Sequence, residues 1–143
     1  IQNRDGYTPL YLAVEMCNID IVRYILNTDC SVNLQDNLDY TPLHKAVQEN
    51  NIDIVRCLLG HTECDVNLQD MFGQTPLHLA VLKGYLACID ILLNLGADVN
   101  IQDKGGKTVL MLACIKNDRK LLETLLIHGA DVNIVDNHGR SAL

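Results

Sequence analysis

The chain contains the stretch Thr75-Pro76-Leu77-His78-Leu79-Ala80, and copies of it begin at Thr8, Thr41 and Thr108. Successive copies are 33, 34 and 33 residues apart, and the start of a fifth copy lies at Ser141. Self-similarity at one fixed period is typical of a solenoid, in which similar structural units stack in a row. The repeat therefore decides the fold.

A second motif recurs in step with the first. It reads Asp-Val-Asn at 65–67, 98–100 and 131–133, and Val-Asn at 32–33. Each motif series contains one spacing of 34 residues instead of 33, so the second unit has one inserted residue. The insertion lies within the stretch 60–63. Two motifs repeating in register are a specific signal, whereas a single copy of either would be weak.

Each unit predicts two helices. Thr is a favoured N-cap residue, and Pro suits the first helical position. In the second unit Leu43, Ala46 and Val47 then follow at helical spacing. A short break separates the two helices of each unit, and Gly or Asn there tolerates the left-handed conformation that ends a helix. The residues at this break are Asn50, Gly84, Asn117 and the poorly fitting Cys17.

The second helix of each unit has an apolar side as well, and a polar turn rich in Asp, Asn and Gly closes the unit. Neither helix can bury its apolar face alone, so successive pairs must stack into a continuous core. We therefore expect an all-α solenoid of helix-turn-helix units that forms one domain, 1–143. Its expected repeats are 1–36, 37–70, 71–103, 104–136 and a partial unit, 137–143.

The units resemble ankyrin repeats over essentially the whole chain. The resemblance is carried by residues 73–80, Gly-Gln-Thr-Pro-Leu-His-Leu-Ala, and by residues 92–100, Leu-Leu-Asn-Leu-Gly-Ala-Asp-Val-Asn. It implies two antiparallel helices and a protruding hairpin loop in each repeat. It also implies that the hairpin tips and the first helices form a concave face that binds other proteins.

Some residues depart from the family pattern. Tyr11 and Met111 replace the motif His, whose hydrogen bonds those two units must do without. Asp29 and Glu63 align with Gly96 and Gly129, so a positive φ there would strain the first two units by roughly 1 kcal/mol each. The chain starts within a turn and stops within a first helix, which suggests a fragment of a longer protein or a short form with imperfect caps.

Charge and composition narrow the function. Residues 1–71 hold four Lys and Arg against eleven Asp and Glu, whereas residues 72–143 hold seven of each. The net charge of −7 and 4% aromatic content disfavour nucleic-acid binding, and no apolar run is long enough for a membrane helix. The acidic half serves either solubility or a basic partner protein. The cysteines are expected to be reduced thiols, which favours a cytoplasmic protein that also enters the nucleus as a second possibility.

No catalytic or metal-binding pattern is present. His44 and His78 are repeat-motif residues, and the His61–Cys64 pair lacks a second pair of zinc ligands. The aspartates of the turns recur because of the architecture and do not converge as an acid–base pair would. We expect a non-enzymatic protein without cofactors, and a monomer unless copies associate end to end.

Partner binding should use the positions at which the repeats differ. Turns usually take small or polar residues, yet three of the six aromatic residues precede the motif Thr, and exposed aromatics are typical interface anchors. The alternative is that the tips pack on one another. The expected contact residues at the tips and first-helix ends are Arg4, Tyr7, Met16, Leu38, Tyr40, Glu49, Met71, Phe72, Gln74, Leu82, Lys104, Lys107 and Lys116.

Two narrower expectations follow from resemblance. Residues 35–44, Gln-Asp-Asn-Leu-Asp-Tyr-Thr-Pro-Leu-His, are similar to a segment of the IκB inhibitors, which implies masking of a basic segment of a Rel-type transcription factor. Besides a general protein-interaction module and an IκB-like inhibitor, a further alternative for the function is a substrate-recruiting domain of a larger enzyme or channel. Ankyrin hairpins are also targets of cytosolic asparaginyl hydroxylases, and the sequence context favours modification at Asn67, Asn100 and Asn133.

Overall fold

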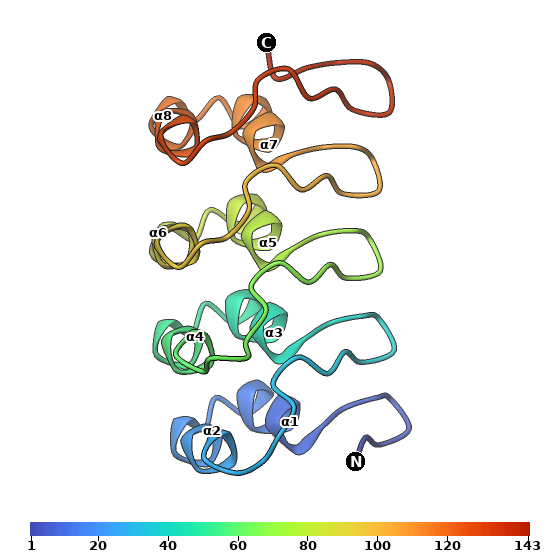
Figure 1. The fold of residues 1–143 in the computed structure, drawn as a ribbon, viewed down its shortest axis with the longest axis vertical. Helices are drawn as coiled ribbons and strands as arrows, with labels where there is room; N and C mark the ends of the chain where they lie inside the picture. Colours follow the sequence, from blue (N-terminus) through green and yellow to red (C-terminus); the bar gives the residue numbers. More distant parts are fainter.

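The computed structural model describes residues 1–143 and contains eight helices in four pairs, stacked in one column (Figure 1). This arrangement confirms the predicted all-α solenoid. None of the helices combines the length and the apolar character that crossing a membrane requires. In chain order the helices are α1 (Pro9–Glu15), α2 (Ile19–Leu26), α3 (Pro42–Gln48), α4 (Ile52–Leu59), α5 (Pro76–Lys83), α6 (Leu86–Asn94), α7 (Val109–Ile115) and α8 (Arg119–Ile127).

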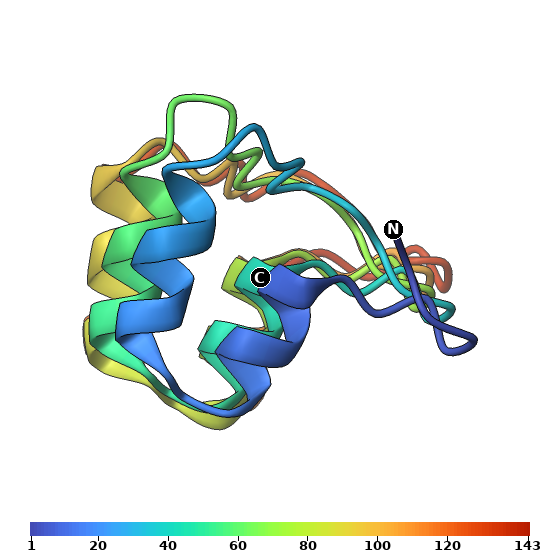
Figure 2. The ribbon, with the colours of Figure 1, turned by 90° about the horizontal axis from the view of Figure 1, so that it is seen from below.

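The helices form two layers. The first helices α1, α3, α5 and α7 line one side of the column, and the second helices α2, α4, α6 and α8 line the other (Figures 1 and 2). Contacts run within each pair and between neighbouring pairs. A hairpin precedes each first helix and projects sideways from the stack. The first-helix layer and the hairpins together offer a long surface that is the same in backbone outline from unit to unit.

Short polar caps set the helix boundaries. The hydroxyl of each motif Thr accepts the backbone N–H three residues ahead, as Thr41 does from His44 at 3.2 Å. After each first helix one residue turns into the left-handed region, and even Cys17 adopts it, with φ of 53°. The second helices α2, α4 and α8 are capped by the side chains of Asn18, Asn51 and Asp118.

Two buried histidines join the caps of neighbouring units. Nδ1 of His44 accepts the backbone N–H of Thr41 at 3.2 Å, and its Nε2 donates to the carbonyl of Gln74 in the next unit at 3.0 Å. His78 repeats this with Thr75 and with the carbonyl of Lys107. Both roles fit a neutral ring with its proton on Nε2. Tyr11 and Met111, which replace this His, make no such side-chain bond to the next unit.

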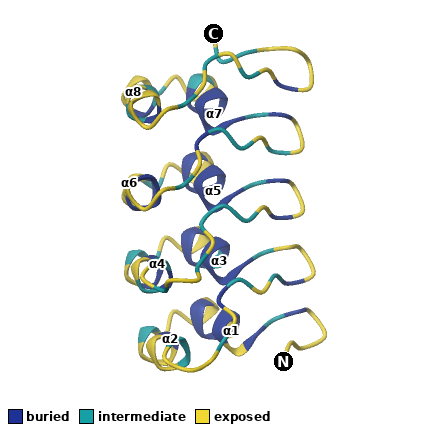
Figure 3. Ribbon diagram, in the orientation of Figure 1, coloured by how far each residue is buried: buried dark blue, intermediate teal, exposed yellow.

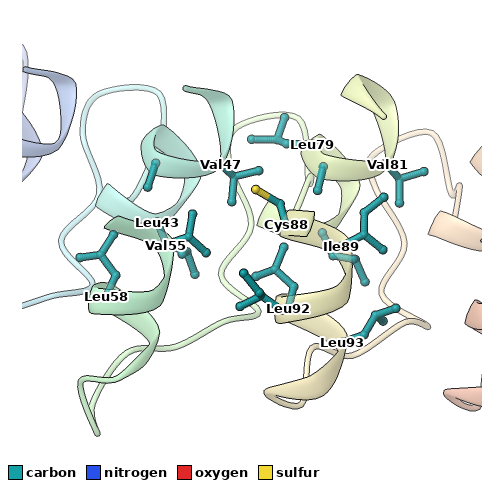
Figure 4. Close-up of a cluster of buried hydrophobic side chains, with 14 of the residues drawn as sticks. Leu43, Val47, Val55, Leu58, Leu79, Val81, Cys88, Ile89, Leu92 and Leu93 are labelled. Carbon is teal, nitrogen blue, oxygen red and sulfur yellow. The ribbon is translucent and has the colours of Figure 1, made fainter. Parts of the chain in front are cut away.

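The apolar core runs through the stack without a break and contains 27 buried side chains. Figure 4 shows where the second and third pairs meet: Cys88 of α6 lies near Val47 of α3 and Leu79 of α5. Ile89 and Leu92 of α6 are buried in the same cluster. Burial of each such aliphatic side chain contributes roughly 1.5–3 kcal/mol. Because the cluster spans every pair, each unit supplies part of its neighbour's core.

The turns after α2 and α4 differ from those after α6 and α8. Gly96 and Gly129 have φ of 87°, but Asp29 and Glu63 do not have positive φ. The prediction of backbone strain at Asp29 and Glu63 is therefore wrong. In the first unit the chain leaves α2 by another path, in which the hydroxyl of Thr28 donates to the carbonyl of Ile25. In the second unit the inserted residue makes the loop near residue 60 stand out beyond its equivalents (Figure 2).

The buried histidines predict a loss of stability in mild acid. Burial lowers the pKa of His44 and of His78 below the ordinary value of about 6.5. Below about pH 6.5 the unfolded chain thus binds protons that the folded chain does not. The free energy of unfolding should fall by at most about 1.4 kcal/mol per pH unit for each His. The urea midpoint at about pH 5.5 and at about pH 7.5 measures this.

A His78→Gln variant should show a smaller drop between the two pH values, whereas His128→Gln, at an exposed His, should keep the full drop. A urea midpoint that is the same at both pH values would contradict the proposed role of the buried rings.

Two glycines with similar backbone angles should respond differently to alanine. Gly73 has φ of 75°, and an added Cβ would lie 2.7 Å from the backbone nitrogen of Lys104. Gly96 has φ of 87° with no atom within 4 Å of the added Cβ. Gly96→Ala should cost about 1 kcal/mol for the backbone angle alone, and Gly73→Ala about twice that because neighbouring hairpins must part. Equal losses in chemical denaturation would show that the hairpins yield freely.

Candidate protein-binding surface

One aspartate shapes each hairpin from the second onward, and Asn3 takes its place in the first. Oδ1 of Asp36 accepts the backbone N–H of Leu38 at 2.8 Å and that of Tyr40 at 2.9 Å. Asp70, Asp103 and Asp136 make the same pair of bonds in the next three hairpins. Such side-chain bonds to the backbone fix the conformation of the loop locally. The hairpins therefore have one common backbone shape.

One tip keeps this shape without glycine. Four hairpins place a Gly with positive φ at the residue three after the aspartate or at its equivalent, namely Gly6, Gly73, Gly106 and Gly139. The second hairpin has Asp39 there, with φ of 59°. Asp tolerates this conformation better than most residues, because its short polar side chain can bond locally. The second tip thus carries an exposed carboxylate where the others carry only backbone.

Hydrogen bonds join each hairpin to the next. The backbone N–H of Met71 donates to the carbonyl of Leu38 at 3.0 Å, and that of Lys104 donates to the carbonyl of Phe72 at 3.0 Å. A row of glutamines repeats this link, since each side-chain amide donates both to its own hairpin and to the following one. These glutamines are Gln2, Gln35, Gln69 and Gln102. Our sequence analysis missed them, although they recur at the repeat spacing.

Large apolar side chains are exposed at the second and third tips. Leu38 is 52% exposed, Met71 37% and Phe72 58%. Figure 3 shows that the tips are the most exposed part of every hairpin. The common hairpin shape depends on aspartate, glutamine and backbone groups and needs no apolar side chain there. These three residues, which we call the apolar tips, are therefore available for contact with another molecule.

Two predicted tip aromatics lie elsewhere. The ring of Tyr7 stacks on that of Tyr11 with centroids 4.6 Å apart, and the ring of Tyr40 stacks on that of His44 at 5.1 Å. Both are half-buried, because the residue before the motif Thr lies against the first turn of the helix. The expectation that they are freely exposed at the tips is wrong. Burial raises the pKa of Tyr40, and the nearby carboxylates of Asp70 and Asp36 raise it further.

The ends of the first helices carry the other predicted contact residues. Met16, Leu82 and Lys116 are exposed, and Nζ of Lys116 donates to the carbonyl of Leu82 at 2.8 Å. Glu49 is also exposed, but it forms an ion pair with Lys45 at 3.0 Å. Among the hairpin residues, Arg4 and Lys104 are exposed, whereas Gln74 and Lys107 are half-buried.

Comparison with known families assigns the fold. A model of ankyrin repeats, three copies long, matches residues 1–70 and 43–136. The chain belongs to the ankyrin-repeat family. A comparison with curated proteins gives no match. Ankyrin repeats are generally protein–protein interaction modules, and the family is typically non-enzymatic.

The asparagines that recur in the second sequence motif connect successive units. Oδ1 of Asn67 accepts the backbone N–H of Asp98 at 2.8 Å, and Oδ1 of Asn100 accepts that of Asp131 at 2.8 Å. Asn133 is exposed and makes no side-chain hydrogen bond. A hydroxylase would have to break these bonds at the first two sites but not at the third. Modification of the three residues stays a prediction.

The ankyrin surface offers no evident metal centre. No group of three or more His, Cys, Asp or Glu side chains is arranged to hold an ion. Burial raises the pKa of the Cys64 thiol to about 11, which disfavours the thiolate that a metal needs. A hollow of about 280 Å³ lies beside α7 and is lined by Lys107, Met111, Asp136 and Arg140 among others.

Proposed function

We propose that this ankyrin-repeat domain binds a protein partner on the surface formed by the hairpins and the first-helix ends. The observation that supports this most directly is the exposure of Leu38, Met71 and Phe72 on hairpins whose shape does not require them. Exposed apolar side chains on neighbouring rigid loops are suited to be the buried centre of an interface. The ladder of bonds between the hairpins holds them in place before a partner arrives.

Charge favours a partner with a basic segment. Within the first two units the acidic side chains Asp5, Glu15, Asp39 and Glu49 are exposed on the hairpins and first-helix ends. Their basic counterparts are few, and Lys45 is committed to ion pairs with Glu15 at 3.4 Å and Glu49 at 3.0 Å. In the fourth unit Lys104, Lys107 and Lys116 reverse the sign. We therefore expect the basic part of the partner to lie over units one and two.

A scaffold or inhibitor role in the cytoplasm is consistent with such binding, and we propose a monomer as the active form. The contact residues predicted from the sequence belong to this proposal, but their expected contributions to binding differ. The apolar tips are the expected anchors, and Tyr7 and Tyr40 act mainly by supporting the base of their hairpins.

The anchor role of Phe72 can be tested against a matched aromatic. Phe72→Ala should weaken partner binding by about 2 kcal/mol, because a central aromatic anchor is lost. The same change at Tyr24, which is 75% exposed on α2 in the other helix layer, should leave binding unchanged. The partner is first captured from cell extract on the wild-type domain and identified, and the dissociation constants are then measured by calorimetry.

In urea denaturation, the free energy of unfolding of both variants should equal that of the wild type within about 0.5 kcal/mol, since both side chains are exposed. Equal affinity of wild type and Phe72→Ala, or equal losses in the two variants, would refute the tip surface as the binding site.

A further inference from the structure

One buried polar atom in the protein has no partner. Asp70 is 4% exposed, and its Oδ1 accepts the backbone N–H groups of Phe72 and Gln74. Its Oδ2 is buried without any hydrogen bond, and no other buried side-chain oxygen or nitrogen shares this condition. A buried carboxylate oxygen without a donor costs free energy, so a donor that reached Oδ2 would gain a strong hydrogen bond.

The last hairpin shows which group fits. Oδ1 of Asp136 makes the same two backbone bonds as Asp70, at 2.8 and 3.0 Å. Its Oδ2 accepts Nε of Arg140 at 2.9 Å and lies 2.8 Å from Nη2. The shared Oδ1 bonds orient the two carboxylates alike, so Oδ2 of Asp70 faces the residue in the place of Arg140. That residue is Gln74, whose side-chain amide makes no hydrogen bond.

No cation of the chain reaches this oxygen. The two histidines that feel the charge of Asp70, His44 and His78, are buried and held neutral. Lys45, on the helix that begins beside Tyr40, is bonded to Glu15 and Glu49. A hydrogen-bond donor for Oδ2 of Asp70 would therefore have to come from another molecule. This oxygen lies at the base of the hairpin that carries Met71 and Phe72.

We propose that Asp70 anchors an arginine side chain of the bound protein, whose guanidinium donates to Oδ2 as Arg140 does to Asp136. The inference rests on the proposed protein-binding function and names the residue type that the partner contributes. Gln74 is half-buried and its side-chain amide is unbonded, so no hydrogen bond holds it against an incoming ligand. An arginine fits better than a lysine because its planar fork supplies two N–H groups and its stem packs on apolar side chains.

The test uses a blocked pentapeptide with a central arginine flanked by leucines. Its control is the same peptide with citrulline, which keeps the shape and removes the charge. In carbon-detected NMR the arginine peptide should shift the side-chain carboxyl resonance of Asp70 and bind at least about tenfold more tightly than the citrulline peptide. Equal shifts from the two peptides, or no shift at Asp70 with the arginine peptide, would overturn the proposal.

Two variants sharpen the result. Gln74→Arg places an internal guanidinium where Arg140 has one, so the domain should melt at a higher temperature and lose its response to the arginine peptide. Asp103→Asn, the matched change in the next hairpin, should leave the response intact, whereas Asp70→Asn should abolish it. A response kept in Gln74→Arg or Asp70→Asn would overturn the anchor. If Phe72→Ala weakens partner binding but Asp70→Asn does not, the proposed function stands and this inference falls.

Discussion

No helix pair of this protein can bury its apolar face alone, and the rest of the structure follows from that constraint. The 27 core side chains form a single cluster that passes through all four pairs. Each pair is therefore held by its neighbours, and the stack sets the position of every hairpin. His44 and His78 add a polar form of the same dependence, because each ring caps its own helix and bonds the next unit.

The division between structural and variable residues gives the domain its function. Aspartates shape the hairpins, glutamines join them, and threonines start the first helices. With the backbone fixed by these residues, side chains such as Leu38 and Phe72 are free to vary without cost to the fold. The second and third hairpins combine the apolar tips with Oδ2 of Asp70, which has no partner, so a bound protein can gain apolar burial and a charged hydrogen bond in the same place.

The repeat made the fold predictable. The motif Thr, the following Pro and the left-handed break are local features, so the sequence was enough to predict the helix pairs and their stacking. The orientation of Tyr40 depends on His44 within a folded unit, and the lack of a partner for Asp70 depends on the absence of a cation at Gln74. Such features arise from three-dimensional neighbours. The glutamine row was different, because its regular spacing was visible in the sequence and was overlooked.

Native-state hydrogen exchange tests most directly whether each unit is stabilised by its neighbours. Units with a neighbour on both sides should exchange most slowly, so we expect the slowest amides of the 143-residue chain within residues 43–93. The bridging amide of Met71 should be among them. Amides after about residue 120 should exchange fast, since α8 packs on one side only. Uniform protection through to the C-terminal residues would contradict the account.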